Sequence, residues 1–187
     1  MKTYIAKTNF RRVVLELLCG VLAVLALVNQ GGAQAQMEEH EAKAAFVLKL
    51  LNFVEWPSGG GQSSLTIGTI GADETNDALM KLASGKTVNG KTVAVKRLAP
   101  DADLKGIDVL YIGSSQAKNL ASLLDRARGG NVLTIGESDG FDQHGGIVNL
   151  LIADGRIKLE VNPHAAEKAH VQISSRLLSL ATIVNGG

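Results

Sequence analysis

The chain has 187 residues and a mass of 19.6 kDa, which is the size of one domain. Hydrophobic residues make up 45% of it, enough for a core, and its charged residues nearly balance, at a net charge of +1. These values exclude a disordered chain and a strongly basic nucleic-acid-binding protein, and 4% aromatic residues leave little surface for stacking nucleobases.

Residues 1–35 are predicted to be a cleaved secretory signal peptide. A basic stretch precedes the apolar stretch Val13 to Val28, and the small-residue site Ala33-Gln34-Ala35 follows. The alternative is an uncleaved membrane anchor, but Glu16 interrupts the apolar stretch, which is short for a span. We therefore expect an exported domain of residues 36–187 in the bacterial periplasm, with no cysteine, no membrane span and a net charge of −2.

A first helix is predicted over residues 38–55. Its apolar residues fall on one wide arc of the helical wheel, while most charged side chains fall outside that arc. Such an arc normally packs on the protein's own core, and a partner-binding face is the alternative. The helix should stop at Trp56-Pro57, because the residue before a proline disfavours the α conformation. A flexible Gly/Ser loop, 58–64, follows.

The rest of the chain alternates short apolar strands with helices. Six strands are predicted, at 65–70, 91–98, 107–112, 132–135, 147–153 and 156–161. Helices are predicted at 74–83, 116–128 and 176–184, with one short helix that opens at Asn162-Pro163. Asp154-Gly155, between the last two strands, is a hairpin-turn signal. This order predicts an α/β fold, a single domain with one mixed sheet of about six strands flanked by helices.

The segment from Gly136 to Gly140 matches G-x-S-x-G, the nucleophile elbow of serine hydrolases, with Ser138 as the nucleophile. A strand precedes it as the elbow requires. The elbow also needs a helix directly after the serine, whereas Gly145-Gly146 and a hairpin follow here. Hydrolysis is therefore a remote alternative, and no catalytic residue is expected.

Two further motifs are weak. Gly85-Lys86-Thr87 resembles the end of a phosphate-binding loop, but the first glycine of that motif and its strand-to-helix context are missing. Acidic residues and His144 crowd the 136–146 loop, but their spacing matches no calcium loop and one histidine is few for zinc. We expect no metal and no other cofactor.

Several blocks of the mature chain, in order, resemble the YfiR-like family of exported bacterial proteins. The blocks are Ala44-Ala45-Phe46, Phe53-Val54-Glu55-Trp56-Pro57, Gly85-Lys86 with Val88, Gly90 and Val93, Val132-Leu133-Thr134-Ile135, Gly140-Phe141, Gly145-Gly146-Ile147-Val148-Asn149, Gly155-Arg156-Ile157, Leu159-Glu160-Val161-Asn162, and Ile173-Ser174-Ser175 with Leu177-Leu178 and Leu180-Ala181. Together they span nearly the whole mature chain.

This resemblance implies a periplasmic α/β regulator rather than an enzyme. The best understood members of the family repress a membrane-bound diguanylate cyclase, the enzyme that makes cyclic-di-GMP, by acting on its periplasmic sensor domain. The expected partner is therefore the periplasmic domain of an inner-membrane diguanylate cyclase or sensor kinase, and a homodimer is expected. The family's blocks often carry cysteines that suit redox control, whereas the single cysteine here is Cys19, in the predicted signal peptide.

Five residues of these blocks are predicted to contact the partner: Phe46, Glu55, Trp56, Phe141 and His144. Core packing and helix termination are the alternative roles of the first three. A different function, a periplasmic small-molecule-binding module, would place its ligand at the strand ends near Gly71 and Gly113–Ser115.

Overall fold

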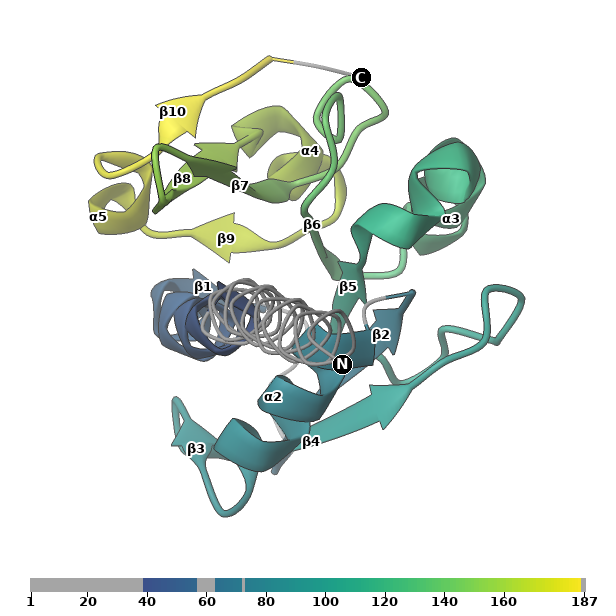
Figure 1. The fold of residues 1–187 in the computed structure, drawn as a ribbon, viewed down its shortest axis with the longest axis vertical. Helices are drawn as coiled ribbons and strands as arrows, with labels where there is room; N and C mark the ends of the chain where they lie inside the picture. Colours follow the sequence, from purple (N-terminus) through teal and green to yellow (C-terminus); the bar gives the residue numbers. More distant parts are fainter. Residues whose placement is uncertain (1–38, 57–62, 72, 186–187) are drawn as a thin grey trace, which may run out of the picture. The chain divides into compact units, whose positions relative to one another are not determined.

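A mixed sheet of eight strands runs through the described residues, which are 39–56, 63–71 and 73–185 of this computed structural model (Figure 1). Its strands lie in the order β10-β8-β7-β6-β5-β2-β4-β3. Their bounds are β2 Ser64–Ile70, β3 Thr87–Val88, β4 Lys91–Arg97, β5 Val109–Ile112, β6 Leu133–Gly136, β7 Val148–Ala153, β8 Arg156–Val161 and β10 Thr182–Ile183. The predicted signal peptide and most of the Gly/Ser loop lie outside the described residues.

The centre of the sheet is parallel. Strands β4, β2, β5, β6 and β7 pair in parallel in that order, and β7 then pairs antiparallel with β8. From β2 the chain passes to β4 on one side, and it then crosses back to β5 on the other side. The carboxyl ends of β2 and β5 therefore meet at the topological switch point, the place where doubly wound folds hold ligands.

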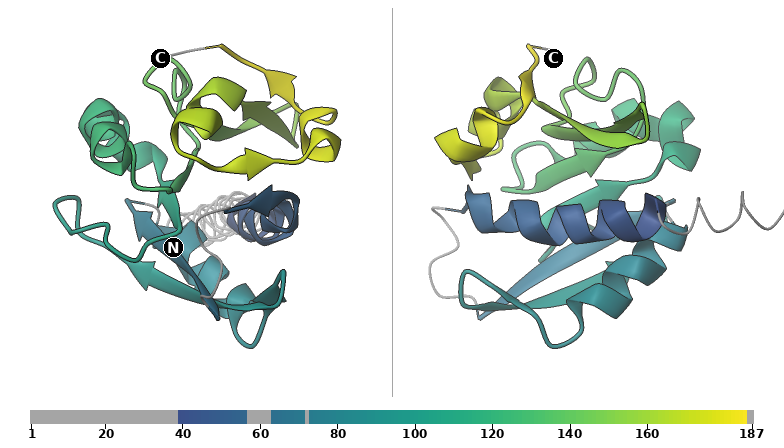
Figure 2. Two further views of the ribbon diagram at one scale, coloured as in Figure 1. Left: turned by 180° about the vertical axis from the view of Figure 1, so that it is seen from behind. Right: turned by 60° about the vertical axis from the view of Figure 1, so that its left-hand side comes forward.

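Helices cover both faces of this sheet (Figure 2). On one face lie the helix of residues 39–50, which continues into a 3-10 turn at Leu51–Phe53, and α2 (Asp73–Ala83). The same core includes buried alanines of α4 (Pro163–Lys168). The other face packs on α3 (Leu120–Ala127), which follows the 3-10 helix Ser114–Asn119. No helix of the described ranges is long and apolar enough to cross a membrane.

The predicted fold class is confirmed, and all six predicted strands are present. The sheet has two more strands, β3 and β10, because two-residue strands at sheet edges are too short to produce a periodicity. The hairpin turn is also confirmed, since Asp154 and Gly155 both have positive φ, at 52° and 68°, as a type I′ turn requires.

Two helix predictions were too long. The first helix gives way to β1 (Val54–Glu55), which pairs antiparallel with β9 (Gln172–Ile173) in a separate two-stranded sheet. The last helix, α5, covers only Ser175–Leu178, and the chain then forms β10 beside β8. In both places the β-branched residues pair with a strand that is distant in sequence, and these tertiary hydrogen bonds outweigh local helix propensity.

Candidate functional site

An apolar groove lies beside the edge strand β10. It has a volume of about 500 Å³, and residues of β8, α5 and the turn after α5 line it together with Phe46 from the first helix. Ile157 and Leu177 contribute apolar side chains, and Arg156 and Lys158 contribute positive charges. We call this feature the Phe46 groove.

Exposed apolar side chains occur at and near the Phe46 groove. Among the described residues, the exposed large hydrophobic side chains are Met80, Ile152, Leu180 and Ile183. Leu180 is 75% exposed and lines the groove, and Ile152 pairs across the hairpin with the lining residue Ile157. Ile183 belongs to β10, which contributes Thr182 to the lining. Strand β10 ends the sheet order, with β8 as its neighbour there. Exposed apolar side chains beside an open sheet edge are typical of a protein-binding surface.

The predicted partner-binding residues lie in different parts of the fold. Phe46 is half-buried in the groove just described, whereas Glu55 is exposed on β1, where it pairs with Gln172. Trp56 follows Glu55 and packs partly against the core, and its indole nitrogen has no hydrogen-bond partner among the described residues.

Phe141 and His144 belong to the turn segment between β6 and β7. The ring of Phe141 is 0% exposed, because it lies between the backbones of Gly136 and Gly146. It therefore packs inside the domain, and a partner could not reach it in this conformation. His144 is exposed on the same turn segment and stays available for contact.

A buried polar cluster closes the carboxyl end of β6. Lys43 of the first helix and Glu137 form an ion pair at 2.8 Å, and both side chains are more than nine-tenths buried. Glu137 also accepts hydrogen bonds from the Tyr111 hydroxyl and from the backbone N–H of Ser114, each at 3.0 Å. This cluster fixes the first helix on the sheet. The signal for it in the sequence is Lys43 itself, since a lysine three residues before Phe46 and four before Val47 lies on the apolar arc.

The structure does not provide the geometry of a serine hydrolase at Ser138. The Ser138 hydroxyl is buried and has no hydrogen-bond partner among the described residues. No described histidine therefore contacts it in the way that a general base would. Turns rather than a helix follow it, over residues 139–145. The acidic side chains of this loop do not converge either, because Glu137 points inward to Lys43, and no cluster suited to a metal occurs within the described ranges.

The turns at the switch point lie side by side, as the strand order requires. The Ser115 hydroxyl donates a 2.6 Å hydrogen bond to the carbonyl of Gly71. A Cβ atom on Gly71 would lie 2.4 Å from the side chain of Gln116, so the two turns are in close contact there.

Comparison with known protein families assigns the chain to one of them. The profile of the family DUF4154, described as YfiR/HmsC-like, matches residues 40–182. The chain belongs to the YfiR/HmsC-like family. This match confirms the resemblance found in the sequence blocks, and it includes the Phe46 groove and the buried polar cluster. The family is one of periplasmic regulatory proteins.

Solved structures similar to this YfiR/HmsC-like chain share its fold. A conserved domain protein from Vibrio cholerae O1 biovar El Tor is 16% identical, with a TM-score of 0.52 over 77% of this chain and 59% of that one. The ABC domain from Streptococcus pneumonia in complex with L-Trp is 12% identical, with a TM-score of 0.54 over 73% of this chain and 58% of that one. The chain thus spans under two thirds of either protein. No curated protein matches it significantly.

Proposed function

We propose that this protein is a periplasmic regulator that binds the periplasmic domain of an inner-membrane diguanylate cyclase or sensor kinase and represses it. The supporting observation is the YfiR/HmsC-like match over residues 40–182. Residues 1–35 would direct the protein across the inner membrane and then be removed. In the periplasm it would act as a homodimer, and repression of the enzyme would lower cyclic-di-GMP synthesis. Repression requires that it bind the inactive state of the enzyme more tightly than the active state, because equal affinity shifts no equilibrium.

The Phe46 groove is the part of the surface that we propose contacts the enzyme. Its apolar side chains and the open edge of β10 suit an extended or helical segment of another protein. Glu55, Trp56 and His144 are proposed as further contacts. Phe141 acts indirectly in this proposal, because its buried ring holds the turn segment that carries His144.

The Leu180→Glu variant tests this surface. Because Leu180 is 75% exposed, the change should leave stability within about 0.5 kcal/mol of the parent. A carboxylate in an apolar contact should weaken binding at least tenfold, which corresponds to about 1.4 kcal/mol. The measurement is capture of the cyclase from detergent-solubilised membranes, together with the cyclic-di-GMP level of cells that carry the variant.

The matched control is Met80→Glu, because Met80 is 51% exposed on α2 and does not line the groove. This control should bind and repress as the parent does. Equal loss in both variants, or full repression by Leu180→Glu, would contradict the proposed surface. Failure of the parent protein to capture any membrane signalling enzyme would contradict the proposed function itself.

The strand order supports a second proposal, a small-molecule-binding module at the switch point between β2 and β5. A ligand there would separate the Ser115 hydroxyl from the Gly71 carbonyl. A panel of amino acids and other small metabolites should then include one that raises Tm, by several degrees at about 100 times its Kd. Ser115→Ala should change the size of this ligand-induced rise in Tm. An unchanged Tm across the whole panel would count against a ligand site at the switch point.

A further inference from the structure

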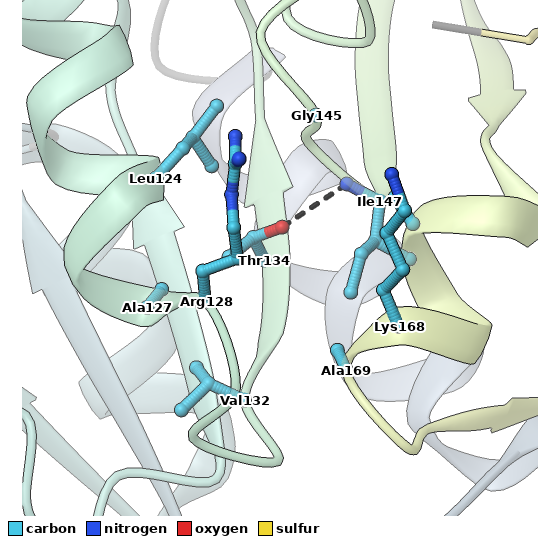
Figure 3. A pocket seen from close by; sticks show the side chains of 10 residues that line it. Leu124, Ala127, Arg128, Val132, Thr134, Gly145, Ile147, Lys168 and Ala169 are labelled. Carbon is cyan, nitrogen blue, oxygen red and sulfur yellow. Dashed lines mark hydrogen bonds between the residues drawn. The ribbon is translucent and has the colours of Figure 1, made fainter. Parts of the chain in front are cut away.

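A small cavity lies between α3 and α4, over β6 (Figure 3). Its volume is about 40 Å³. One water molecule needs a cavity of roughly 10–15 Å³, and a whole small-molecule site occupies hundreds of Å³. The cavity therefore fits one side-chain-sized group. Its walls are apolar, with Leu124 and Ala127 on the α3 side and Ala169 beyond α4.

Two cations stand on opposite sides of this cavity. Arg128 directly follows α3, and Lys168 is the last residue of α4. Figure 3 shows both side chains beside the cavity, which Gly145 also lines. Arg128 forms an ion pair with Asp125 at 3.1 Å, and the two side chains are 60% and 66% exposed. An ion pair this exposed contributes little free energy, so the guanidinium can exchange it for another carboxylate.

The polar atoms around the cavity also suit an anion. The buried Thr134 hydroxyl accepts a hydrogen bond from the Ile147 N–H at 3.0 Å, which leaves its own proton to be donated. Gly145 has a φ of +85°, and a Cβ atom there would lie 3.3 Å from Arg128 Nη2. Because Gly145 has no side chain, the Arg128 guanidinium can lie close to the loop.

We propose that this basic cavity docks one acidic side chain of a protein partner. The aliphatic stem of a glutamate would lie against the apolar walls, and its carboxylate would lie between Arg128 and Lys168. Charge complementarity selects the occupant, because two cations line the cavity and a guanidinium can bind a carboxylate through two hydrogen bonds. The docking site deepens the proposed function and rests on it for the existence of a protein partner. His144, adjacent to Gly145 in sequence, lies on the same turn segment.

A peptide titration tests the docking site without the signalling enzyme. The protein is purified after expression of the full chain, and its amide NMR shifts are followed while Ac-Val-Glu-Ala-NH2 is added. The expected result is a saturable shift centred on Arg128, Gly145 and Lys168. The amide analogue Ac-Val-Gln-Ala-NH2 should bind at least tenfold more weakly, and so should the glutamate peptide to Arg128→Glu/Lys168→Glu.

Lys118→Glu is the matched control, because Lys118 is an exposed cation that does not line the cavity. Its affinity for the glutamate peptide should stay within twofold of the parent. Equal binding of the two peptides, equal loss in the control, or shifts away from the cavity would overturn the proposal. Acetate that binds as tightly as the peptide would also overturn it, since the site would then take free carboxylates. None of these outcomes bears on capture of the signalling enzyme through the Phe46 groove.

Discussion

The Phe141→Ala variant is expected to lose about 3–5 kcal/mol of unfolding free energy. The ring of Phe141 is completely buried and packs with the core on the α3 side of the sheet. A Cβ atom on Gly136 or Gly146 would lie 2.2 or 2.1 Å from that ring, so the ring fills the space that these glycines leave. At Gly136 and Gly146 backbone borders the resulting cavity, and backbone cannot relax into it as flexible side chains can.

Urea unfolding followed by circular dichroism measures this loss, with an unchanged m-value as evidence that both states keep their compactness. Phe141→Leu serves as the control, because it keeps most of the apolar volume and should cost less than the alanine variant. Gly146→Ala should also destabilise the protein, since the added Cβ would lie 2.7 Å from the backbone oxygen of Phe141. A loss below about 1 kcal/mol in Phe141→Ala would show that the ring does not hold this turn segment.

The Glu137→Ala variant is expected to lose a similar amount, about 3–5 kcal/mol, for an electrostatic reason. Removal of the carboxylate leaves the ammonium of Lys43 buried without the ion pair that it makes at 2.8 Å. It also takes away an acceptor of the Tyr111 hydroxyl and the acceptor of the Ser114 N–H. The cost of breaking a buried ion pair exceeds the small net contribution of an average hydrogen bond.

A second variant separates the charge effect from packing. Lys43→Met/Glu137→Gln removes both charges and keeps an amide oxygen as an acceptor, so it should lose less than Glu137→Ala. The exposed ion pair between Lys81 and Glu41, at 3.0 Å, provides the control, and Glu41→Ala should change stability by less than about 1 kcal/mol. Equal losses in Glu41→Ala and Glu137→Ala would mean that burial does not govern the strength of the Lys43 pair.

Local patterns predicted the elements whose signals are contained in a few neighbouring residues. The strands of the parallel centre are short apolar runs, and the Asp154-Gly155 turn has the dihedral angles that its composition favours. The helix that was predicted to open at Asn162-Pro163 begins there, because Asn162 caps α4 by accepting a hydrogen bond from the Ala165 N–H. Ser174 caps α5 in the same way, with the Leu177 N–H as donor.

Long-range pairing explains the elements that were missed. Residues 182–183 resemble the end of a helix in isolation, but their backbone pairs with Glu160 and Val161 of β8. Val54 and Glu55 likewise pair with β9, more than a hundred residues further along the chain. Local periodicity contains no information about which distant strand has a free edge beside such a segment.

The candidate sites also combine features that local sequence patterns predict with features that only long-range contacts decide. The amino-acid sequence by itself determined the α/β class, the order of the strands along the chain, the hairpin turn, the start of the short helix at Asn162-Pro163, and the resemblance to the YfiR-like family. Only the tertiary structure decided that Lys43 meets Glu137 across 94 residues, that Phe141 is buried, and that Arg128 and Lys168 flank one cavity. The physical reason is that such contacts depend on the lateral order of the strands, which brings the ends of distant elements together.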